Sequence, residues 1–309
     1  MNNMNNPLVS VIITTYQRPD YALRAIKSAL AQTYQNKQIY IIEDGGETAL
    51  EQQLAELKLP NVIYIAHKQN MGLAAARNTG IKCSEGDYVA FLDDDDEWIE
   101  TKLSEQIELA VKTDENCACI YCAAELVDEK EQMMGENRPK LRGSIKQEIQ
   151  RIGLHTIPSS CLFKRQALHK TGGYDESLKS HIDHDIWMSL AKHNFNCDYT
   201  PKKLVRTYEH KGTRITNNTI ARIAATRQYC AKWKPELTKW YGAKEAHEYL
   251  SRFQSRVYLM IGRNSLKNGK RLDALKYYCI ALRFDIKNKK CYRNIAELFR
   301  IPKSPGAHC

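Results

Sequence analysis

The sequence predicts an α/β fold in which a mostly parallel central sheet is flanked by helices and followed by an α-helical extension. Three observations predict it. Apolar runs alternate with segments of helical period within residues 7–98, the alternation loosens over 99–215, and the period is helical over 216–309. We therefore expect an N-terminal tail at 1–6, a main domain at 7–215 and a helical C-terminal extension.

The first half of the main domain alternates strands with helices. β-Branched or apolar runs without a helical period mark the strands, and apolar residues at helical spacing mark the helices. The first helix is expected to begin at Asp20, which can cap its N-terminus, and the third follows a turn that starts at Asn70. The strands are expected at 8–14, 38–43, 62–66 and 88–92, and the helices at 20–30, 50–57 and 73–80.

The second half and the extension follow weaker patterns. Two apolar stripes in the extension predict a helix pair joined by a turn at 268–270, and a single tetratricopeptide-like hairpin is a second interpretation. The stripes are Tyr249, Phe253, Val257, Met260 and Ile261, and then Leu272, Leu275, Tyr278 and Ala281. Before them we expect a helix at 103–110, a strand at 117–127, a loop at 128–142, a strand at 158–163, a turn at 172–174 and a helix at 186–190.

Charge is distributed unevenly along the 309 residues. Residues 1–200 hold 21 Lys and Arg against 29 Asp and Glu, whereas residues 201–309 hold 25 against 7, within a total net charge of +10. A basic extension on an acidic body favours an anionic partner, either membrane lipid or nucleic acid. No run reaches the roughly 18 apolar residues that span a bilayer, and the N-terminus lacks signal-peptide features, so we expect a cytoplasmic protein.

The ten cysteines are irregularly spaced, and without an export signal they are expected to be free thiols. Cys117, Cys119 and Cys122 lie in a segment that alternates like a strand. We interpret them as buried strand residues, with a zinc site as the alternative.

A buried strand leads directly into four consecutive aspartates, Asp93 to Asp96. Four adjacent carboxylates repel one another, and a hard divalent cation that carries a phosphorylated ligand would supply the counter-charge. A solvated acidic loop is the alternative. Because ligands bind at the carboxyl ends of parallel strands, Tyr16 and Asp44 are expected to converge with this run.

Five segments occur in an order that resembles family 2 glycosyltransferases with the A-type fold: Val9–Pro19, Ile42–Gly46, Asn70–Gly80, Phe91–Trp98 and Gly172–Glu176. The resemblance implies transfer of a sugar from a nucleotide sugar to an acceptor hydroxyl, with inversion at the anomeric carbon. It also implies that the main domain is catalytic, with a nucleotide-sugar half followed by an acceptor half.

The resemblance implies roles for the aspartate run. The family's Asp-any-Asp element falls on Asp93 and Asp95, so Asp95 is expected to bind Mn²⁺ or Mg²⁺. Asp93 and Asp94 are expected near the ribose or a metal-bound water. Because the register within four aspartates can shift by one, Asp96 is the alternative ligand. A bound cation would stabilise the charge that develops on the diphosphate.

The resemblance implies that the nucleotide is uridine diphosphate, with guanosine and thymidine forms as alternatives, and that residues from three segments bind it. Asp44 matches the acidic residue that accepts a hydrogen bond from the base, although its neighbour is Glu where the family usually has Asp. The backbone around Thr14 and Tyr16, together with Arg18 and Arg77, is expected to complete the pocket. A surface arginine is the alternative interpretation of Arg77.

An inverting displacement needs a base that takes the proton of the attacking hydroxyl. The family's base precedes a helix after the Gly-Gly-aromatic-Asp turn, and Asp183 fits that place. Asp185 is the alternative, or else a cap of the following helix. His210 stands where some relatives place a histidine that reaches the metal or the diphosphate, and a structural histidine is the alternative.

The expected acceptor is a glycan or a polyprenyl-diphosphate-linked sugar in bacterial O-antigen or capsule assembly. The basic extension would hold the enzyme at the inner face of a membrane, or would instead form a homodimer. Two other functions stay open. A sugar-1-phosphate nucleotidyltransferase would normally carry a glycine-rich phosphate loop, which Thr15–Pro19 is not. A non-enzymatic scaffold or nucleic-acid binder would use the basic extension, and its binding would weaken steeply with salt.

Overall fold

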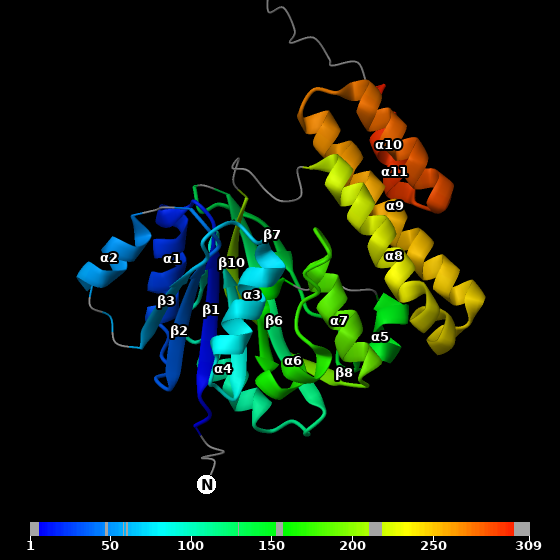
Figure 1. Cartoon of the computed structure of the whole chain (residues 1–309). Coiled ribbons are helices and arrows are strands. Elements are labelled where there is room, and N and C mark those ends of the chain that lie inside the picture. The colour runs from blue at the N-terminus through cyan, green and yellow to red at the C-terminus, as the bar shows by residue number, and fades with distance from the viewer. Residues whose placement is uncertain are drawn as a thin grey trace, which may run out of the picture. The chain divides into compact units, whose positions relative to one another are not determined.

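A computed structural model gives the structure of the chain, which divides into two compact units, Met1–Gly212 and Thr213–Cys309 (Figure 1). The structure describes residues 6–46, 49–57, 59, 61–128, 130–152, 157–209 and 218–299.

In the described part of the first unit, ten strands form one sheet. Its main path runs β3-β2-β1-β4-β9-β6-β10-β5, with β7 paired to β6 and β8 paired to β10. The strands are β1 (Val9–Thr15), β2 (Lys37–Glu43), β3 (Val62–Ala66), β4 (Tyr88–Asp93), β5 (Asp96–Trp98), β6 (Cys117–Asp128), β7 (Met133–Asn137), β8 (Gly143–Ser144), β9 (Cys161–Lys164) and β10 (Asn196–Glu209).

The pairing changes character along the sheet. Strands β3, β2, β1 and β4 pair in parallel with one another, as expected for a sheet built from alternating strands and helices. Strand β9 is antiparallel to both β4 and β6, β10 is parallel to β6, and β5 returns antiparallel to β10. The predicted α/β sheet is confirmed, and the second half adds the antiparallel pairings.

Helices cover both faces of this sheet (Figure 1). The helices α1, α2 and α4 pack on the face that holds Val9, Val11 and Ile13. On the other face, α3 approaches Ile12 of β1, and α7 places Trp187 against Phe163 of β9. The helices of this unit are α1 (Pro19–Leu30), α2 (Leu50–Leu57), α3 (Leu73–Cys83), α4 (Lys102–Ala110), α5 (Ile145–Ile152), α6 (Arg165–Thr171) and α7 (Ile182–Lys192), with a 3₁₀ turn η1 (Pro158–Ser160).

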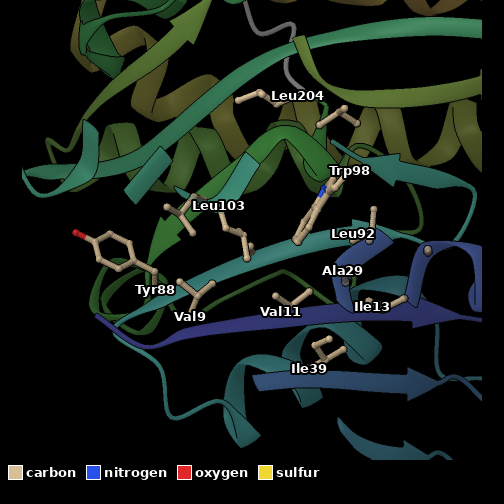
Figure 2. Packing of buried hydrophobic residues seen from close by; sticks show 14 of the residues in the cluster. Val9, Val11, Ile13, Ala29, Ile39, Tyr88, Leu92, Trp98, Leu103 and Leu204 are labelled. Carbon is tan, nitrogen blue, oxygen red and sulfur yellow. The ribbon is translucent and has the colours of Figure 1, made fainter. Parts of the chain in front are cut away.

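Figure 2 shows the core between β1, β4 and the helices on the first face. Alternate residues of β1 point into it together with Leu92 of β4, and Trp98 and Leu103 close it from the far side. Because a strand exposes successive side chains to opposite faces, burial of both faces requires the continuous apolar runs that the sequence contains. This packing fixes the strand ends at which Asp44 and the aspartate run lie.

Several elements differ from the predictions. Helix α1 begins at Pro19 after Arg18 at the N-cap position, so Asp20 lies in its first turn and does not cap it. Residues 158–160 form a 3₁₀ turn, so within the predicted strand 158–163 only 161–163 pair with neighbours, and β9 extends one residue further to Lys164. Strand β7 lies inside the predicted loop 128–142. Its backbone pairs with β6, and its exposed methionines and its glutamate give no apolar pattern from which a strand could be predicted.

The second unit is helical, with α8 (Thr219–Tyr241), α9 (Ala243–Lys267), α10 (Arg271–Phe284) and α11 (Lys289–Leu298). The turn at 268–270 joins α9 to α10 as predicted. Met260 and Leu272 do not belong to the buried stripes, since they are 47% and 84% exposed. Across the described residues, no helix combines the length and the apolar character that crossing a bilayer needs. Cys117, Cys119 and Cys122 are buried in β6, as the strand interpretation predicted.

Candidate active site

The four aspartates alternate between two environments. The run spans the end of β4, a two-residue turn and the start of β5. The side chains of Asp93 and Asp95 are 28% and 22% exposed, whereas Asp94 is 1% exposed and Asp96 is buried. Alternate members of the run therefore face outward, and the solvated-loop interpretation does not describe it.

Asp94 is held by the segment that follows β1. Its Oδ2 accepts a hydrogen bond from Thr15 Oγ1 at 2.8 Å, and its Oδ1 lies 2.5 Å from Arg18 Nη2. Burial raises the pKa of Asp94 to about 7, against the attraction of Arg18. The aspartate therefore ties the turn after β4 to the N-terminus of α1.

Asp96 is part of a buried frame. Ser159 Oγ donates to Asp96 Oδ2 at 2.5 Å and accepts from the backbone N–H of Asp93 at 3.1 Å. The indole Nε1 of Trp98 donates to the carbonyl of Ser159 at 2.7 Å. The turn η1 thus sets the geometry of both ends of the run, and Asp96 is engaged in that frame.

Asp95 lies at the outer side of the turn. Its carboxylate is 3.4 Å from Arg18 Nη1, and its carbonyl accepts from Arg24 Nη2 at 3.0 Å. Arg24 also approaches Glu97, which accepts a hydrogen bond from Tyr208 Oη at 2.6 Å. Polar contacts of Asp95 and Glu97 therefore connect the turn to both α1 and β10.

Carboxylates outnumber guanidiniums here. The arginines Arg18, Arg24 and Arg77 form ion pairs with five carboxylates, those of Asp93, Asp94, Asp95, Glu97 and Asp183. Burial raises the pKa of Asp93, with Arg77 opposing the rise and Asp95 and Asp183 adding to it. Such a site fits a divalent cation. Within the described residues, no three His, Cys, Asp or Glu side chains could hold a metal ion by themselves. An ion at Asp95 would therefore complete its shell with phosphate and water, as Mg²⁺ usually does.

Asp44 organises the loop before α3. Its Oδ1 accepts from the backbone N–H of Met71 at 2.9 Å and lies 2.8 Å from His67 Nδ1, and its Oδ2 accepts from the N–H of Gly72 at 2.7 Å. The other ring nitrogen of His67 is 2.9 Å from Thr79 Oγ1. Asp44 thus has a structural role that the sequence did not indicate.

The remaining residues expected at the nucleotide lie at the ends of β1 and β4. Thr14 is buried in β1 and pairs in register with Asp93. Tyr16, directly after β1, is 43% exposed. The position of His210 falls outside the described residues.

Asp183 lies in the first turn of α7, and its side chain is 37% exposed. Its Oδ1 is 2.5 Å from Nη1 of Arg77, whose Nη2 is 2.7 Å from Oδ1 of Asp93. Asp185 is buried inside α7, and His181 holds the N-cap position, so Asp185 does not cap this helix. Arg77 is 1% exposed, which excludes a surface arginine.

Sequence reasoning missed Ser159, Arg24 and His67. Each acts through a partner that is distant in sequence, such as Asp96 for Ser159 and Asp44 for His67. No pattern of spacing or composition distinguishes these residues from ordinary polar residues.

A family model described as Glycosyl transferase family 2 matches residues 10–172. An uncharacterized glycosyltransferase of Rickettsia typhi is 32% identical over 241 residues, which cover 77% of this chain and 74% of that protein. The Escherichia coli protein named UDP-Glc:alpha-D-GlcNAc-diphosphoundecaprenol beta-1,3-glucosyltransferase WfaP is 40% identical over 100 residues, covering 32% of this chain and 40% of its own length.

Two solved structures share the expected fold. TarS of S. aureus, solved with UDP-GlcNAc, matches with a TM-score of 0.67 at 15% identity, over 90% of this chain and 81% of that one. The mannosyltransferase PcManGT of Pyrobaculum calidifontis, in complex with GDP-Man and Mn²⁺, matches with a TM-score of 0.57 at 15% identity, over 96% of this chain and 81% of that one. At this identity the likeness concerns the fold alone.

Proposed function

Because this chain belongs to glycosyl transferase family 2, we propose that it transfers a sugar from a nucleoside-diphosphate sugar to an acceptor hydroxyl, with inversion at the anomeric carbon. The observation that carries the proposal is the convergence of two carboxylate groups on one guanidinium. Asp93 belongs to the aspartate run and Asp183 to α7, and both contact Arg77. Inversion requires a leaving group and a base on opposite sides of the reacting carbon. Asp93 of β4 would lie on the side of the leaving group, and Asp183 of α7 would supply the base.

Asp183 is the proposed general base. Its Oδ1 faces Arg77, so Oδ2 is available to accept the proton of the attacking hydroxyl. The partial exposure of this side chain suits a group that must meet an acceptor from solvent. Asp185 is buried in the helix, which argues against it as the base.

Asp95 is the proposed ligand of Mn²⁺ or Mg²⁺, and Asp93 is proposed to lie near the ribose or a metal-bound water. When bound, the cation would offset the negative charge that develops on the diphosphate. Asp96 is engaged by Ser159, which supports the register in which Asp93 and Asp95 are the outward pair. His210 remains a proposed additional ligand.

The nucleotide is proposed to be uridine diphosphate, held at the ends of β1 and β2. Asp44 Oδ2 accepts one backbone hydrogen bond and has capacity for a second, which the N–H of a base can supply. Thr14, Tyr16 and Arg18 would surround the ribose and the phosphates. In this arrangement residues 7–98 bind the donor, and residues 99–215 shape the acceptor side.

The proposed acceptor is a sugar on a glycan or a polyprenyl diphosphate, in the assembly of a bacterial surface polysaccharide. The name of WfaP, a diphosphoundecaprenol glucosyltransferase, supports this class of acceptor. Residues 219–299 carry 18 Lys and Arg against 6 Asp and Glu, a charge that suits an anionic membrane surface. The enzyme would then work as a peripheral protein at the cytoplasmic face.

The experiment that tests the function is a panel of nucleotide sugars incubated with Mn²⁺ and acceptor sugars, read out as release of free nucleoside diphosphate. We expect release with one donor, and its abolition by EDTA and by Asp95→Ala. Asp114→Ala is the matched control, because Asp114 is an exposed aspartate outside the site. Full metal-dependent transfer by Asp95→Ala would refute the ligand assignment. Release of pyrophosphate from a nucleoside triphosphate would instead indicate a nucleotidyltransferase.

Membrane attachment is tested by sedimentation with liposomes. Arg252 and Arg256 lie one turn apart on the exposed face of α9. Charge reversal of both to Glu should reduce binding to liposomes that contain phosphatidylglycerol and leave the negligible binding to neutral phosphatidylcholine unchanged. Reversal of Lys82 and Lys112, which changes the net charge equally on the first unit, should have a smaller effect. Equal losses from both pairs would show that the total charge, and not the helical unit, drives binding.

A further inference from the structure

The guanidinium of Arg77 is enclosed on all sides. Arg77 lies on α3, is 1% exposed, and stands over two aromatic rings, with 5.6 Å from its Cζ to the centroid of Phe91 and 5.2 Å to that of Tyr174. Its Nη1 donates to Asp183 and its Nη2 to Asp93. Burial by itself would lower the pKa of Arg77, but the carboxylates of Asp183 and Asp93 raise it well above the ordinary value. The cation is therefore fixed by two anions.

The geometry points to Arg77 as a positioning residue that orients the base and couples it to the donor side of the site. It holds Asp183 by Oδ1, so Oδ2 is the oxygen that would take the proton of the acceptor. The same guanidinium holds Asp93, so the position of the base depends on the position of the aspartate run. This inference rests on the proposed function, because it takes Asp183 as the base.

Arg77 is a poor candidate for direct binding of the diphosphate. Both terminal nitrogens donate to carboxylates, and its Nε is buried without a hydrogen-bond partner. Because the Arg77 side chain is 1% exposed, a phosphate has no open approach to the guanidinium in this arrangement. Arg77 thus acts on the reaction through Asp183 and Asp93.

The neighbouring residue of α3 holds the backbone on the acceptor side. Asn78 Nδ2 donates to the backbone carbonyl of Tyr174 at 2.8 Å, and Asn78 Oδ1 accepts from the backbone N–H of Tyr174 at 2.8 Å. Gly173 has a φ of +73°, and a Cβ there would lie 2.6 Å from Asn78 Oδ1, so the turn requires glycine. Asn78 therefore fixes the turn, whereas Arg77 fixes the carboxylate, and the two contributions can be separated by mutation.

The test compares Arg77→Met, Arg77→Lys and the control Asn78→Ala in the full chain. For each variant, kcat and KM are measured with the donor that the wild type uses, and the affinity for UDP with Mn²⁺ is measured by calorimetry. Misplacement of a reacting group by about 1 Å can cost about 100-fold in rate. We expect Arg77→Met to lose about that much in kcat, with clearly smaller changes in UDP affinity and donor KM, because Asp93 keeps its place at the end of β4 when it loses the Arg77 contact.

Arg77→Lys keeps a cation but cannot donate to Asp183 and Asp93 from two fixed nitrogens. Its kcat should therefore lie between those of Arg77→Met and the wild type. Asn78→Ala should lower thermal stability more than it lowers kcat. A fall in UDP affinity that matches the fall in kcat/KM would overturn the inference and make Arg77 a nucleotide ligand. An unchanged kcat in Arg77→Met would also overturn it, because Asp183 would then not need Arg77. If Arg77→Met does not fold, Arg77→Lys decides by the same criteria. Absence of sugar transfer by the wild type would refute the proposed function separately.

Discussion

A buried lysine packs beside the residues that hold the aspartate run, and its titration makes the free energy of unfolding depend on pH. Lys102 of α4 is fully buried, its Nζ donates to Gln106 Oε1 at 2.7 Å, and it lies 4.0 Å from the centroid of the Trp98 ring. Gln106 Nε2 in turn donates to the carbonyls of Ile120 and Ser160. Burial lowers the pKa of Lys102 from its ordinary value of 10.5 to about 8.

The sign of the effect follows from proton binding. Between pH 8 and 10.5 the unfolded chain binds more protons at Lys102 than the folded protein, so the free energy of unfolding rises with pH across that window. Below pH 8 the cost of burying the charge is fully present, at about 3 kcal/mol, and above 10.5 it disappears. Between pH 7 and pH 10 the wild type should therefore gain about 2 to 3 kcal/mol from this residue.

Lys102→Met removes the titrating group. At pH 7 the relief of the buried charge is offset by loss of a donor to Gln106, which costs about 1 to 3 kcal/mol, so the net change there should be small. Equilibrium unfolding in urea at pH 7, 8.5 and 10 should show the wild type becoming more stable relative to this variant as pH rises. Lys112→Met, which removes an exposed lysine of the same region, should run parallel to the wild type. Parallel curves for wild type and Lys102→Met would refute the reasoning.

Two further predictions concern the proposed base and the helix that carries Arg77. Asp183→Asn should lower kcat by about 10² to 10⁴-fold with UDP affinity unchanged, whereas Asp185→Asn should keep turnover within tenfold of the wild type; the reverse result would move the base by two residues. Gly80→Ala places a Cβ 2.4 Å from Ile12 Cγ2. The added methyl group should destabilise the fold by about 1 to 3 kcal/mol through overpacking, which exceeds the gain of about 1 kcal/mol in helix propensity. The midpoint of thermal unfolding should therefore fall. Gly135→Ala, which meets no atom within 4 Å, should not lower it.

The first half of the sheet could be predicted because its signal is local. Strands that are buried on both faces need largely continuous apolar runs; the segment 8–14 is one that includes only Ser10 and Thr14 as polar residues, and 88–92 is another. The charged end of the second run then identifies the strand terminus at which the aspartates lie. Local sequence is sufficient where burial is complete.

Strand β10 could not be predicted in this way. It contains Pro201 and the pair Lys202 and Lys203, which break the alternation, and its pairing with β6 shifts register at three places. Its role depends on partners that come much earlier in the chain, β6 and β5. The same limit applies to Arg77 and Asp183, which are 106 residues apart and meet only in the folded domain.

The division of labour within Asp93 to Asp96 has the same origin. Four identical side chains give no local reason to prefer one register, so the sequence leaves Asp95 and Asp96 as alternatives for the metal. The difference comes from distant hydroxyl groups: Thr15 engages Asp94 and Ser159 engages Asp96, from 79 and 63 residues away. These contacts hold Asp94 and Asp96 in buried positions, whereas the side chains of Asp93 and Asp95 are partly exposed, which favours Asp93 and Asp95 as the pair proposed to face the donor.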